Sequence, residues 1–413
     1  MDAISNLLTR GVDKIYPSRG ALEKVLRSGK KIILYLGVDP SGDKLHIGHT
    51  VVLRKLKQFQ DLGHHVILLV ADFTGMIGDP TGKKEGRKQL SLEQVRENGK
   101  FYKEQAAKVI NFGGSNPVEI KNNSQWLAKL KFEEILKLAS HFTVQQMIER
   151  DMFQDRIKRG DDIHLHEFLY PLMQGYDSVA MNVDLEIGGT DQTFNMLAGR
   201  KLMAQLLNKE KFVLTVPLLT DSKGVKIGKT EGNAIALTDI PSEFYGKVMS
   251  LGDDSIIPCF TLLTDQPLSE IEEIKKKVAA GENPMTFKKQ LAYELTKQFN
   301  TEQSAKDAQI EFEKVHQSYD LDWMKSSLSS LPTISLDKIS IGGFVSGATI
   351  AAGTVPLYVS SKSEFKRLEN QNAIEILKPV TQETIKVNEQ VKIEITEGDI
   401  IKIGKKTRLK VKI

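Results

Sequence analysis

Short, continuously apolar runs recur through the first 240 residues of the chain. The clearest span residues 31–38, 65–73 and 212–219, and Gly, Pro or Asp residues bound them. Apolar runs of this length without polar alternation are typical of strands that are buried on both faces of a parallel sheet. The pattern therefore predicts at least three buried, parallel strands.

A helical repeat lies between the first two apolar runs. Val52, Leu56, Phe59 and Leu62 recur at helical spacing with polar residues between them, and Gly63 follows as a typical helix-ending residue. Strands that alternate with helices in this way predict an α/β fold with a Rossmann-like, doubly wound parallel sheet. Such a sheet binds its ligands beyond the C-terminal ends of its strands.

The second half of the chain has a different pattern. Charged helical repeats from Leu268 to about Ser318, interrupted at residues 281–284, predict a small helical domain, and a Ser-rich stretch after it predicts a linker. Near the C-terminus, Ser361–Leu377 predicts a helix leading into a strand. The last residues alternate apolar and basic positions, which predicts a hairpin turning near Gly404–Thr407. The predicted boundaries are 1–239 for the α/β domain, 240–325 for the helical domain, 326–338 for the linker and 339–413 for the tail.

Composition limits the class of protein. The 413 residues suffice for two to three domains of about 150 residues each. No apolar run approaches the roughly 20 residues of a membrane span, and the N-terminus, with Asp2 and Asp13, lacks the order of a signal peptide, so we expect a cytoplasmic protein. The one cysteine, Cys259, excludes disulfides within the chain and multi-cysteine zinc sites. The net charge of +4 is too small to indicate a nucleic-acid partner by itself.

Two histidines bracket the point where the first strand leads into a helix. His46 and His49 lie three residues apart and share a face at the helix N-terminus, where unpaired N–H groups attract phosphate. Gly48 between them has no Cβ, which lets a nucleotide approach the backbone closely. Histidines placed there by chance are the alternative, but only 8 of the 413 residues are His, and two of them flank this junction.

Two signatures identify a family resemblance. His46-Ile47-Gly48-His49 resembles the HIGH signature of class I aminoacyl-tRNA synthetases, and Lys226–Thr230 resembles their second, KMSKS-type signature. Ile227, Gly228 and Thr230 depart from the commonest form of the second signature, but both lysines are present. A phosphate-binding P-loop at residues 78–84 is excluded, because Ile77 and Lys84 stand where Gly and Ser or Thr are required.

A second group of residues indicates which amino acid is activated. Tyr170, Gln174 and Asp177 recur along one face of a helix, and Tyr35 ends the first strand. A solvated polar stripe is the alternative for the helix face. A phenol both donates and accepts a hydrogen bond, so a site for one needs an acceptor such as Asp177 and a partner such as the Tyr35 hydroxyl. Pro171 in this helix predicts a lost backbone hydrogen bond and a kink.

These residues resemble the tyrosine pocket of tyrosyl-tRNA synthetases, and the resemblance implies the following roles. Tyr35 and Asp177 hold the substrate hydroxyl, and Asp79, Tyr170 and Gln174 hold the α-ammonium group. Gln192 lies at the reacting carboxylate, and Asp191 at the ATP ribose, although an N-cap role is the alternative for Asp191. The full set of implied ATP-binding residues is Gly37, Asp39, Ser41, His46, Gly48, His49, Gly189, Asp191 and Lys229. The implied catalytic residues are His46, His49, Lys226, Lys229, Thr230, Lys83 and Arg87, with the last two acting late, around pyrophosphate.

The resemblance implies a two-step reaction. The carboxylate of tyrosine attacks the α-phosphate of ATP, and the 3′ end of tRNA(Tyr) then takes the tyrosyl group. Such chemistry depends on positioning and charge stabilisation, so we expect ATP with Mg²⁺ as substrate, no tightly bound cofactor and no protein metal site. Family members pair through an insertion, which corresponds here to residues 116–150, and this implies a homodimer.

The C-terminal tail resembles the S4-type RNA-binding module, on the pattern Ser361-Lys362-Ser363-Glu364 with Arg367. Basic residues of such a module contact RNA phosphates, and the candidates are Lys362, Arg367, Lys405, Lys406 and Arg408. A solvated, lysine-protected strand edge is the alternative. The tetrapeptide KIGK occurs twice, and this interpretation assigns the copy at Lys226 to nucleotide chemistry and the copy at Lys402 to RNA.

Three rival functions remain. A tryptophanyl-tRNA synthetase is disfavoured because the pair Tyr35 and Asp177 does not suit an indole, which has only a donor N–H. A small nucleotidylyltransferase with an HxGH motif is disfavoured by the lysine loop and the basic tail. A catalytically silent RNA-binding relative is disfavoured by the intact histidines and lysines of both signatures.

Overall fold

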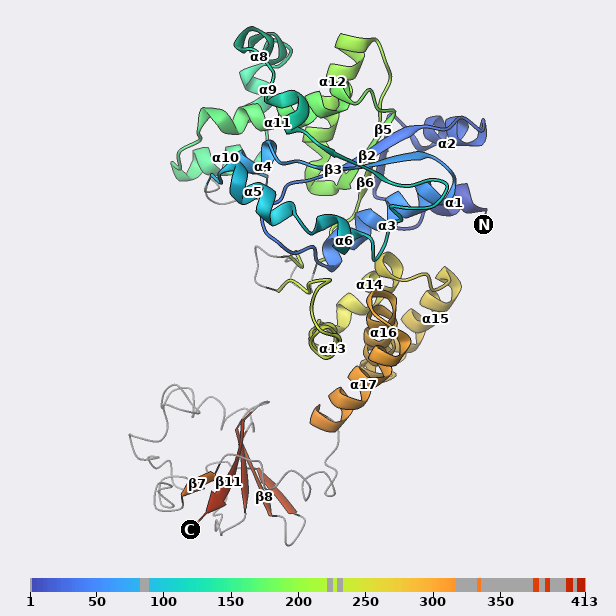
Figure 1. The fold of residues 1–413 in the computed structure, drawn as a ribbon. Helices are drawn as coiled ribbons and strands as arrows, with labels where there is room; N and C mark the ends of the chain where they lie inside the picture. The colour runs from blue at the N-terminus through green and yellow to red at the C-terminus, as the bar shows by residue number, and fades with distance from the viewer. Residues whose placement is uncertain are drawn as a thin grey trace. The chain divides into compact units, whose positions relative to one another are not determined.

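The structure is a computed structural model, and it describes residues 2–81, 89–220, 226–228, 233–316, 333–335, 374–378, 383–386, 399–403 and 407–412 (Figure 1). The chain divides into two compact units, residues 1–310 and 311–413. None of the described helices combines the length and the apolar character that crossing a membrane requires.

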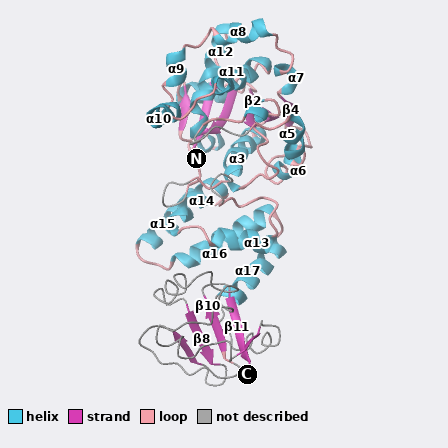
Figure 2. Ribbon diagram, turned by 90° about the vertical axis from the view of Figure 1, so that its left-hand side faces the viewer, coloured by secondary structure: helices cyan, strands magenta, loops and turns pink. Residues whose placement is uncertain are grey.

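The first unit contains a six-stranded, mainly parallel sheet, which confirms the predicted α/β fold (Figure 2). The strand order is β1-β6-β5-β2-β3-β4, and only β1 runs antiparallel to its neighbour. The strands are β1 (Lys14–Tyr16), β2 (Ile33–Val38), β3 (His65–Val70), β4 (Glu119–Asn122), β5 (Leu185–Gly189) and β6 (Phe212–Val216).

The order of the strands creates a crevice between β2 and β5. From β2 the chain proceeds outward through β3 to β4, and it then returns to the other side of β2 to form β5 and β6. Because parallel crossovers are right-handed, helices on the two sides of this reversal lie on opposite faces of the sheet. Figure 1 shows α11 (Leu165–Ala180) and α12 (Thr193–Leu207) on one face and α3 (Ile47–Asp61) on the other. Ligands of such sheets bind at this reversal point.

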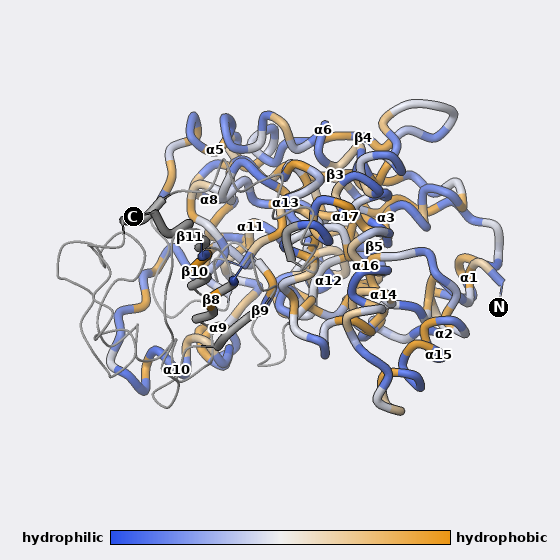
Figure 3. The backbone as a smooth tube through the Cα atoms, turned by 90° about the horizontal axis from the view of Figure 1, so that it is seen from below, coloured by the Kyte–Doolittle hydropathy of each residue, from blue (hydrophilic) through white to orange (hydrophobic). Residues whose placement is uncertain are grey.

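Local sequence explains β2, β3 and α3. The predicted apolar runs correspond to β2, β3 and β6, and β3 ends three residues earlier than predicted, at Val70. Figure 3 shows hydrophobic and hydrophilic stretches following one another along the backbone. The buried strand residues include Leu34 and Ile67, each at most 1% exposed. Helix α3 begins after its N-cap, His46, and stops before Gly63, whose φ of 77° favours glycine.

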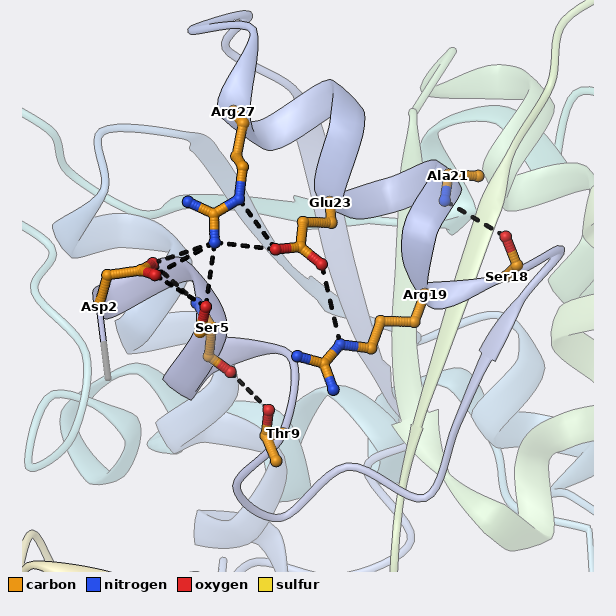
Figure 4. A network of polar contacts seen from close by, with 8 residues as sticks. All are labelled: Asp2, Ser5, Thr9, Ser18, Arg19, Ala21, Glu23 and Arg27. Carbon is orange, nitrogen blue, oxygen red and sulfur yellow. Dashed lines mark hydrogen bonds and ion pairs between the residues drawn. The ribbon is translucent and has the colours of Figure 1, made fainter.

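Shorter helices make up much of the remaining chain before residue 240. At the N-terminus, the α1 and α2 helices are tied together by Arg27, which bonds both Asp2 and Glu23 (Figure 4). Helix α11 continues through Pro171 to Ala180. The remaining helices before residue 240 are α1 (Ala3–Leu7), α2 (Arg19–Arg27), α4 (Thr74–Ile77), α5 (Leu92–Gly99), α6 (Tyr102–Ala106), α7 (Ser124–Leu127), α8 (Phe132–Ala139), α9 (Val144–Ile148) and α10 (Asp151–Arg159).

The charged repeats after residue 240 form helices, as predicted. Gly281, with φ 89°, and Pro284 at the start of α16 separate α15 from α16. The Arg10 guanidinium donates to the Phe260, Thr261, Thr264 and Gln266 carbonyls at the end of α14, and these bonds attach the helices to the N-terminal segment. The helices are α13 (Pro241–Met249), α14 (Ile256–Leu263), α15 (Leu268–Ala279), α16 (Pro284–Phe299) and α17 (Glu302–His316). The boundary at residue 239 stays a prediction.

The second unit contains a five-stranded sheet of order β7-β11-β10-β8-β9. Strands β10 and β11 pair antiparallel with Lys402 opposite Arg408, which confirms the predicted terminal hairpin. The helix predicted before residue 374 lies outside the described residues. The strands are β7 (Thr333–Ser335), β8 (Ile374–Lys378), β9 (Glu383–Lys386), β10 (Ile400–Ile403) and β11 (Thr407–Lys412).

Candidate active site

A cavity of about 460 Å³ occupies the crevice at the C-terminal ends of β2 and β5. Its wall also includes the start of α3, one face of α11 and residues 226–228. Predicted site residues that line this single cavity are Tyr35, Gly37, Asp39, Ser41, His46, Gly48, His49, Asp79, Tyr170, Gln174, Asp177, Gly189, Asp191, Gln192 and Lys226. The fold therefore brings together residues that lie up to 191 positions apart in the chain.

The two histidines form a reciprocal cap at the start of α3. His46 Nδ1 accepts from the Gly48 N–H and His49 Nδ1 accepts from the His46 N–H, both at 3.1 Å, and the ring centroids are 4.0 Å apart. Burial, with Lys226 nearby, lowers the pKa of His46 from 6.5 to about 4, and burial also lowers the pKa of His49. Both imidazoles are therefore neutral at pH 7. Because Nδ1 accepts in each ring, each proton resides on Nε2, which can donate to a phosphate oxygen.

One expectation about this helix terminus is wrong. The first N–H groups of α3 are not available to phosphate, because Ile47 N–H donates to the Ile235 carbonyl at 3.0 Å, and those of His46 and Gly48 donate to the imidazoles. The Nε2–H groups of the two histidines are then donors that this helix terminus still offers. Sequence spacing placed these histidines at the terminus but could not show that they occupy its donors.

The two signature segments lie against each other. A Cβ at Gly48 would lie 2.9 Å from His46 Cε1 and 3.1 Å from the Ile227 carbonyl oxygen, so only glycine fits between them. The backbone of His46 forms an isolated antiparallel β-bridge with Ala236, just beyond the second signature. The Ile227 N–H donates to the Leu219 carbonyl at 2.8 Å. Segments about 180 residues apart in the sequence therefore form one surface.

Lys226 is held by a carboxylate of the same cavity. Its ammonium lies 2.8 Å from Asp191 Oδ2. No side-chain cap bond joins Asp191 to the helix that follows it, so the alternative N-cap role is wrong. A Cβ at Gly189 would lie 2.6 Å from Asp191 Oδ1, which explains a glycine there.

One end of the cavity contains Tyr35 and Asp177. Asp177 is 2% exposed; its Oδ1 accepts from Trp126 Nε1 at 2.8 Å and its Oδ2 from Asn123 Nδ2 at 3.2 Å. The Tyr35 hydroxyl lies 2.9 Å from Ser178 Oγ. Burial raises the pKa of Tyr35 well above its usual range, so its hydroxyl stays protonated, and burial also raises the pKa of Asp177. A hydroxyl donor and a carboxyl group whose two oxygens both accept hydrogen bonds therefore share this end of the cavity.

A set of acceptors lies nearer the signatures. Asp79 Oδ2 accepts from Gln192 Nε2 at 2.5 Å, and the Tyr170 hydroxyl donates to Asp39 Oδ2 at 2.8 Å. Gln174 Nε2 donates to Glu186 Oε1 at 3.1 Å. Gln174 lines the cavity, and its Oε1 is buried and has no hydrogen-bond partner in the described part of the chain.

Some predicted residues cannot be placed. Lys83, Arg87, Lys229 and Thr230 lie outside the described residues, as do Lys362, Arg367, Lys405 and Lys406. Arg408 lies in β11.

The sequence analysis missed several residues that support the cavity. Trp126 and Asn123 bind Asp177, and Ser178, Glu186 and Lys211 form a buried cluster behind Tyr35. A charged residue inside the otherwise apolar strand at 185–187, and a lysine directly before the apolar run at 212, were the available signals.

Comparisons with known proteins agree with this geometry. A model of the family described as "tRNA synthetases class I (W and Y)" matches residues 27–317. The chain is 42% identical to the tyrosine–tRNA ligase of Carboxydothermus hydrogenoformans over 98% of its own length and 96% of that protein, and 42% identical to that of Thermotoga maritima over 90% and 88%. Among solved structures, a C-terminally truncated mitochondrial tyrosyl-tRNA synthetase of Aspergillus nidulans has a TM-score of 0.62 at 24% identity, covering 76% of this chain and 93% of that chain, and shares the fold.

The matched family and the paired signatures define a class I aminoacyl-tRNA synthetase of the tryptophanyl and tyrosyl group. Within this group, the relatives of about 40% identity over nearly the whole chain are tyrosine–tRNA ligases. The chain belongs to the tyrosyl-tRNA synthetase family, as its sequence signatures predicted.

Proposed function

We propose that the cavity is where this tyrosine–tRNA ligase makes tyrosyl-adenylate from L-tyrosine and ATP. The observation that carries the proposal is that Tyr35 and Asp177 line the same cavity as His46 and Lys226. A slot for an aromatic alcohol thus adjoins donors for phosphate. The test is ATP–pyrophosphate exchange with each of the twenty amino acids: tyrosine alone should support turnover, and exchange with tryptophan would reassign the pocket.

Tyrosine lies with its phenol between Tyr35 and Asp177, where Tyr35 donates to the phenol oxygen and Asp177 accepts its proton. Phenylalanine would leave both groups without the hydrogen bond that the substrate phenol makes to them, and this is the basis of discrimination already established for this enzyme family itself. At the other end, Gln174 Oε1 has no partner among the described residues, and it accepts from the α-ammonium group together with Asp79 and Tyr170.

ATP lies along the start of α3, with its ribose at Asp191 and its phosphates at the Nε2–H donors of His46 and His49. Lys226 exchanges its bond to Asp191 for one to the leaving pyrophosphate, assisted by Lys229, Thr230, Lys83 and Arg87. In this proposal Mg²⁺ arrives bound to the phosphates of ATP. In-line attack of the tyrosine carboxylate on the α-phosphate then forms the adenylate and releases pyrophosphate.

Residues 116–150 mediate homodimerisation in this proposal. Large apolar side chains are exposed along α8 and α9, including Phe132 at 74%, Leu136 at 56% and Val144 at 67%. Exposed apolar surface of this kind marks a protein interface. Sedimentation of Phe132→Glu should give monomers, whereas Leu207→Glu, at an exposed apolar residue elsewhere, should remain a dimer. A dimeric Phe132→Glu variant would exclude this interface.

The C-terminal unit is proposed to act as an S4-like module that binds tRNA(Tyr) in the cytoplasm. Its terminal hairpin, β10 and β11, belongs to the strongly basic stretch predicted for RNA contact. Helices α13 to α17 would lie on the anticodon side of the bound tRNA. Basic side chains of the C-terminal unit and of these helices contribute affinity by contacting the phosphates of tRNA, and the α/β domain supplies the chemistry.

A further inference from the structure

A buried ion pair lies directly behind the proposed tyrosine pocket. Lys211, immediately before β6, and Glu186, in β5, have side chains that are 0% and 2% exposed, and the Lys211 ammonium contacts Glu186 Oε2. The same ammonium donates to Ser178 Oγ at 2.7 Å and to the Met196 carbonyl at 3.2 Å. Glu186 forms part of the cavity wall, and Lys211 lies behind it.

Two glycines provide the space for this ammonium. A Cβ at Gly199 of α12 would lie 2.6 Å from Lys211 Nζ and 2.8 Å from Ser178 Oγ. A Cβ at Gly175 of α11 would lie 3.1 Å from the Gly199 nitrogen, so the two helices approach closely only because both residues are glycine. The crossing of α11 and α12 is therefore built around the buried lysine.

The first branch of the cluster is a chain of hydrogen bonds that runs from Lys211 through Ser178 to Tyr35, at the phenol end of the pocket. An ammonium group donates only, so Ser178 Oγ must accept from Lys211 and has its own proton left to donate. The Tyr35 oxygen, at 2.9 Å, is the nearer acceptor, since Glu186 Oε2 lies at 3.4 Å and already binds Lys211. With Ser178 donating to Tyr35, the Tyr35 proton is left for another acceptor, which is either the Glu186 carboxylate, with which Tyr35 also interacts, or the oxygen of a substrate in the cavity.

The second branch leads to the ammonium end. A carboxylate accepts only, so Glu186 Oε1 binds the nitrogen of the Gln174 amide and not its oxygen. This contact fixes the orientation of the amide and leaves the buried Gln174 Oε1, which has no partner among the described residues, as the amide atom that can accept from a ligand. The donor at one end of the pocket and the acceptor at the other thus both depend on the same ion pair.

We propose that Lys211 and Glu186 are positioning residues for tyrosine recognition: the pair directs the Tyr35 hydroxyl toward the phenol of the substrate and the Gln174 oxygen toward its ammonium group. This inference rests on the tyrosine-binding roles proposed above for Tyr35 and Gln174. It makes specificity for tyrosine depend on Lys211, a residue that does not itself line the cavity.

The decisive experiment separates positioning from stability. Lys211→Met leaves Glu186 buried without its partner and should lower the Tm, whereas the double variant Lys211→Met/Glu186→Leu removes both charges and should recover the Tm. In ATP–pyrophosphate exchange, both variants should raise the KM for tyrosine by about tenfold or more and leave the KM for ATP within about twofold. Recovery of the tyrosine KM together with the Tm in the double variant would show a merely structural pair and overturn the proposal.

Ser178→Ala tests the first branch and keeps both charges of the ion pair, although it also removes one acceptor of the Lys211 ammonium. The ratio of kcat/KM for tyrosine to that for phenylalanine should fall about tenfold, because Tyr35 loses the donor that directs its proton. This variant also keeps the proposal testable if the double variant fails to fold. An unchanged ratio in Ser178→Ala would refute the proposed chain of hydrogen bonds from Lys211 through Ser178 to Tyr35.

Lys55→Met is the matched control. Lys55 is a buried lysine of α3 whose ammonium donates to the Leu7 carbonyl at 2.7 Å, away from the cavity. Its replacement should lower the Tm and leave the tyrosine KM and the tyrosine-to-phenylalanine ratio unchanged. If the unmodified enzyme exchanges with tyrosine alone while the Lys211 and Ser178 variants retain its discrimination, the proposal on positioning fails and the proposed function stands.

Discussion

Replacing Asp177 by Asn tests the phenol end of the pocket most directly, because the change conserves shape and removes one acceptor atom. Asp177 accepts from Trp126 through Oδ1 and from Asn123 through Oδ2, and in the proposed complex it also accepts from the substrate phenol. An amide has one oxygen and one NH₂ group. In either orientation its NH₂ group therefore faces a donor.

The size of the effect follows from these contacts. Loss of a buried hydrogen bond to a charged acceptor costs about 2 to 3 kcal/mol, which is roughly a 30- to 150-fold decrease in kcat/KM for tyrosine. Phenylalanine makes no such bond, so its kcat/KM should change little, and the tyrosine-to-phenylalanine ratio should fall by the same factor. The mismatch with Trp126 or Asn123 exists without substrate as well, and it should lower the Tm.

The assay is ATP–pyrophosphate exchange with tyrosine and phenylalanine varied separately at saturating ATP. Asp184→Asn is the control, because Asp184 is also buried, at 9% exposure, and accepts from the Ile33 N–H at 2.9 Å outside the cavity. It should lower stability without altering the ratio. An Asp177→Asn enzyme with the discrimination of the unmodified enzyme would refute the assignment of Asp177 to the phenol.

Three further predictions concern the signatures and the tail. Gly48→Ala should push His46 away from Ile227 and lower kcat for exchange by about 100-fold with little change in the tyrosine KM, as steady-state kinetics would show. The free energy of unfolding should decrease as the pH falls from about 6.5 to about 4, because the unfolded state binds a proton that buried His46, with its pKa of about 4, does not. Urea titrations across this range should show a smaller decrease in His46→Asn. Lys405→Ala/Lys406→Ala should raise the KM for tRNA and reduce its dependence on salt, by roughly one in logarithmic slope per lost phosphate contact, without affecting exchange.

The fold was predictable where local pattern carries the information. The apolar runs that became β2, β3 and β6, and the helical repeat that became α3, owe their structure to periodicity and to a glycine stop. The same holds for the terminal hairpin. Strand ends were less certain, because a residue such as Phe73 is apolar whether or not it pairs with a neighbouring strand.

Sequence by itself determined the two signatures, the polar face of α11 and the family to which they point, because each of these is a spacing along a few residues. Only the tertiary structure determined that Gly48 packs on Ile227, that Trp126 and Asn123 bind Asp177, and that Lys211 pairs with Glu186 behind Tyr35. These contacts join residues from separate strands and helices. Their hydrogen-bonding directions, and therefore the chemistry of the pocket, arise only when the folded chain excludes water from groups that the sequence places far apart.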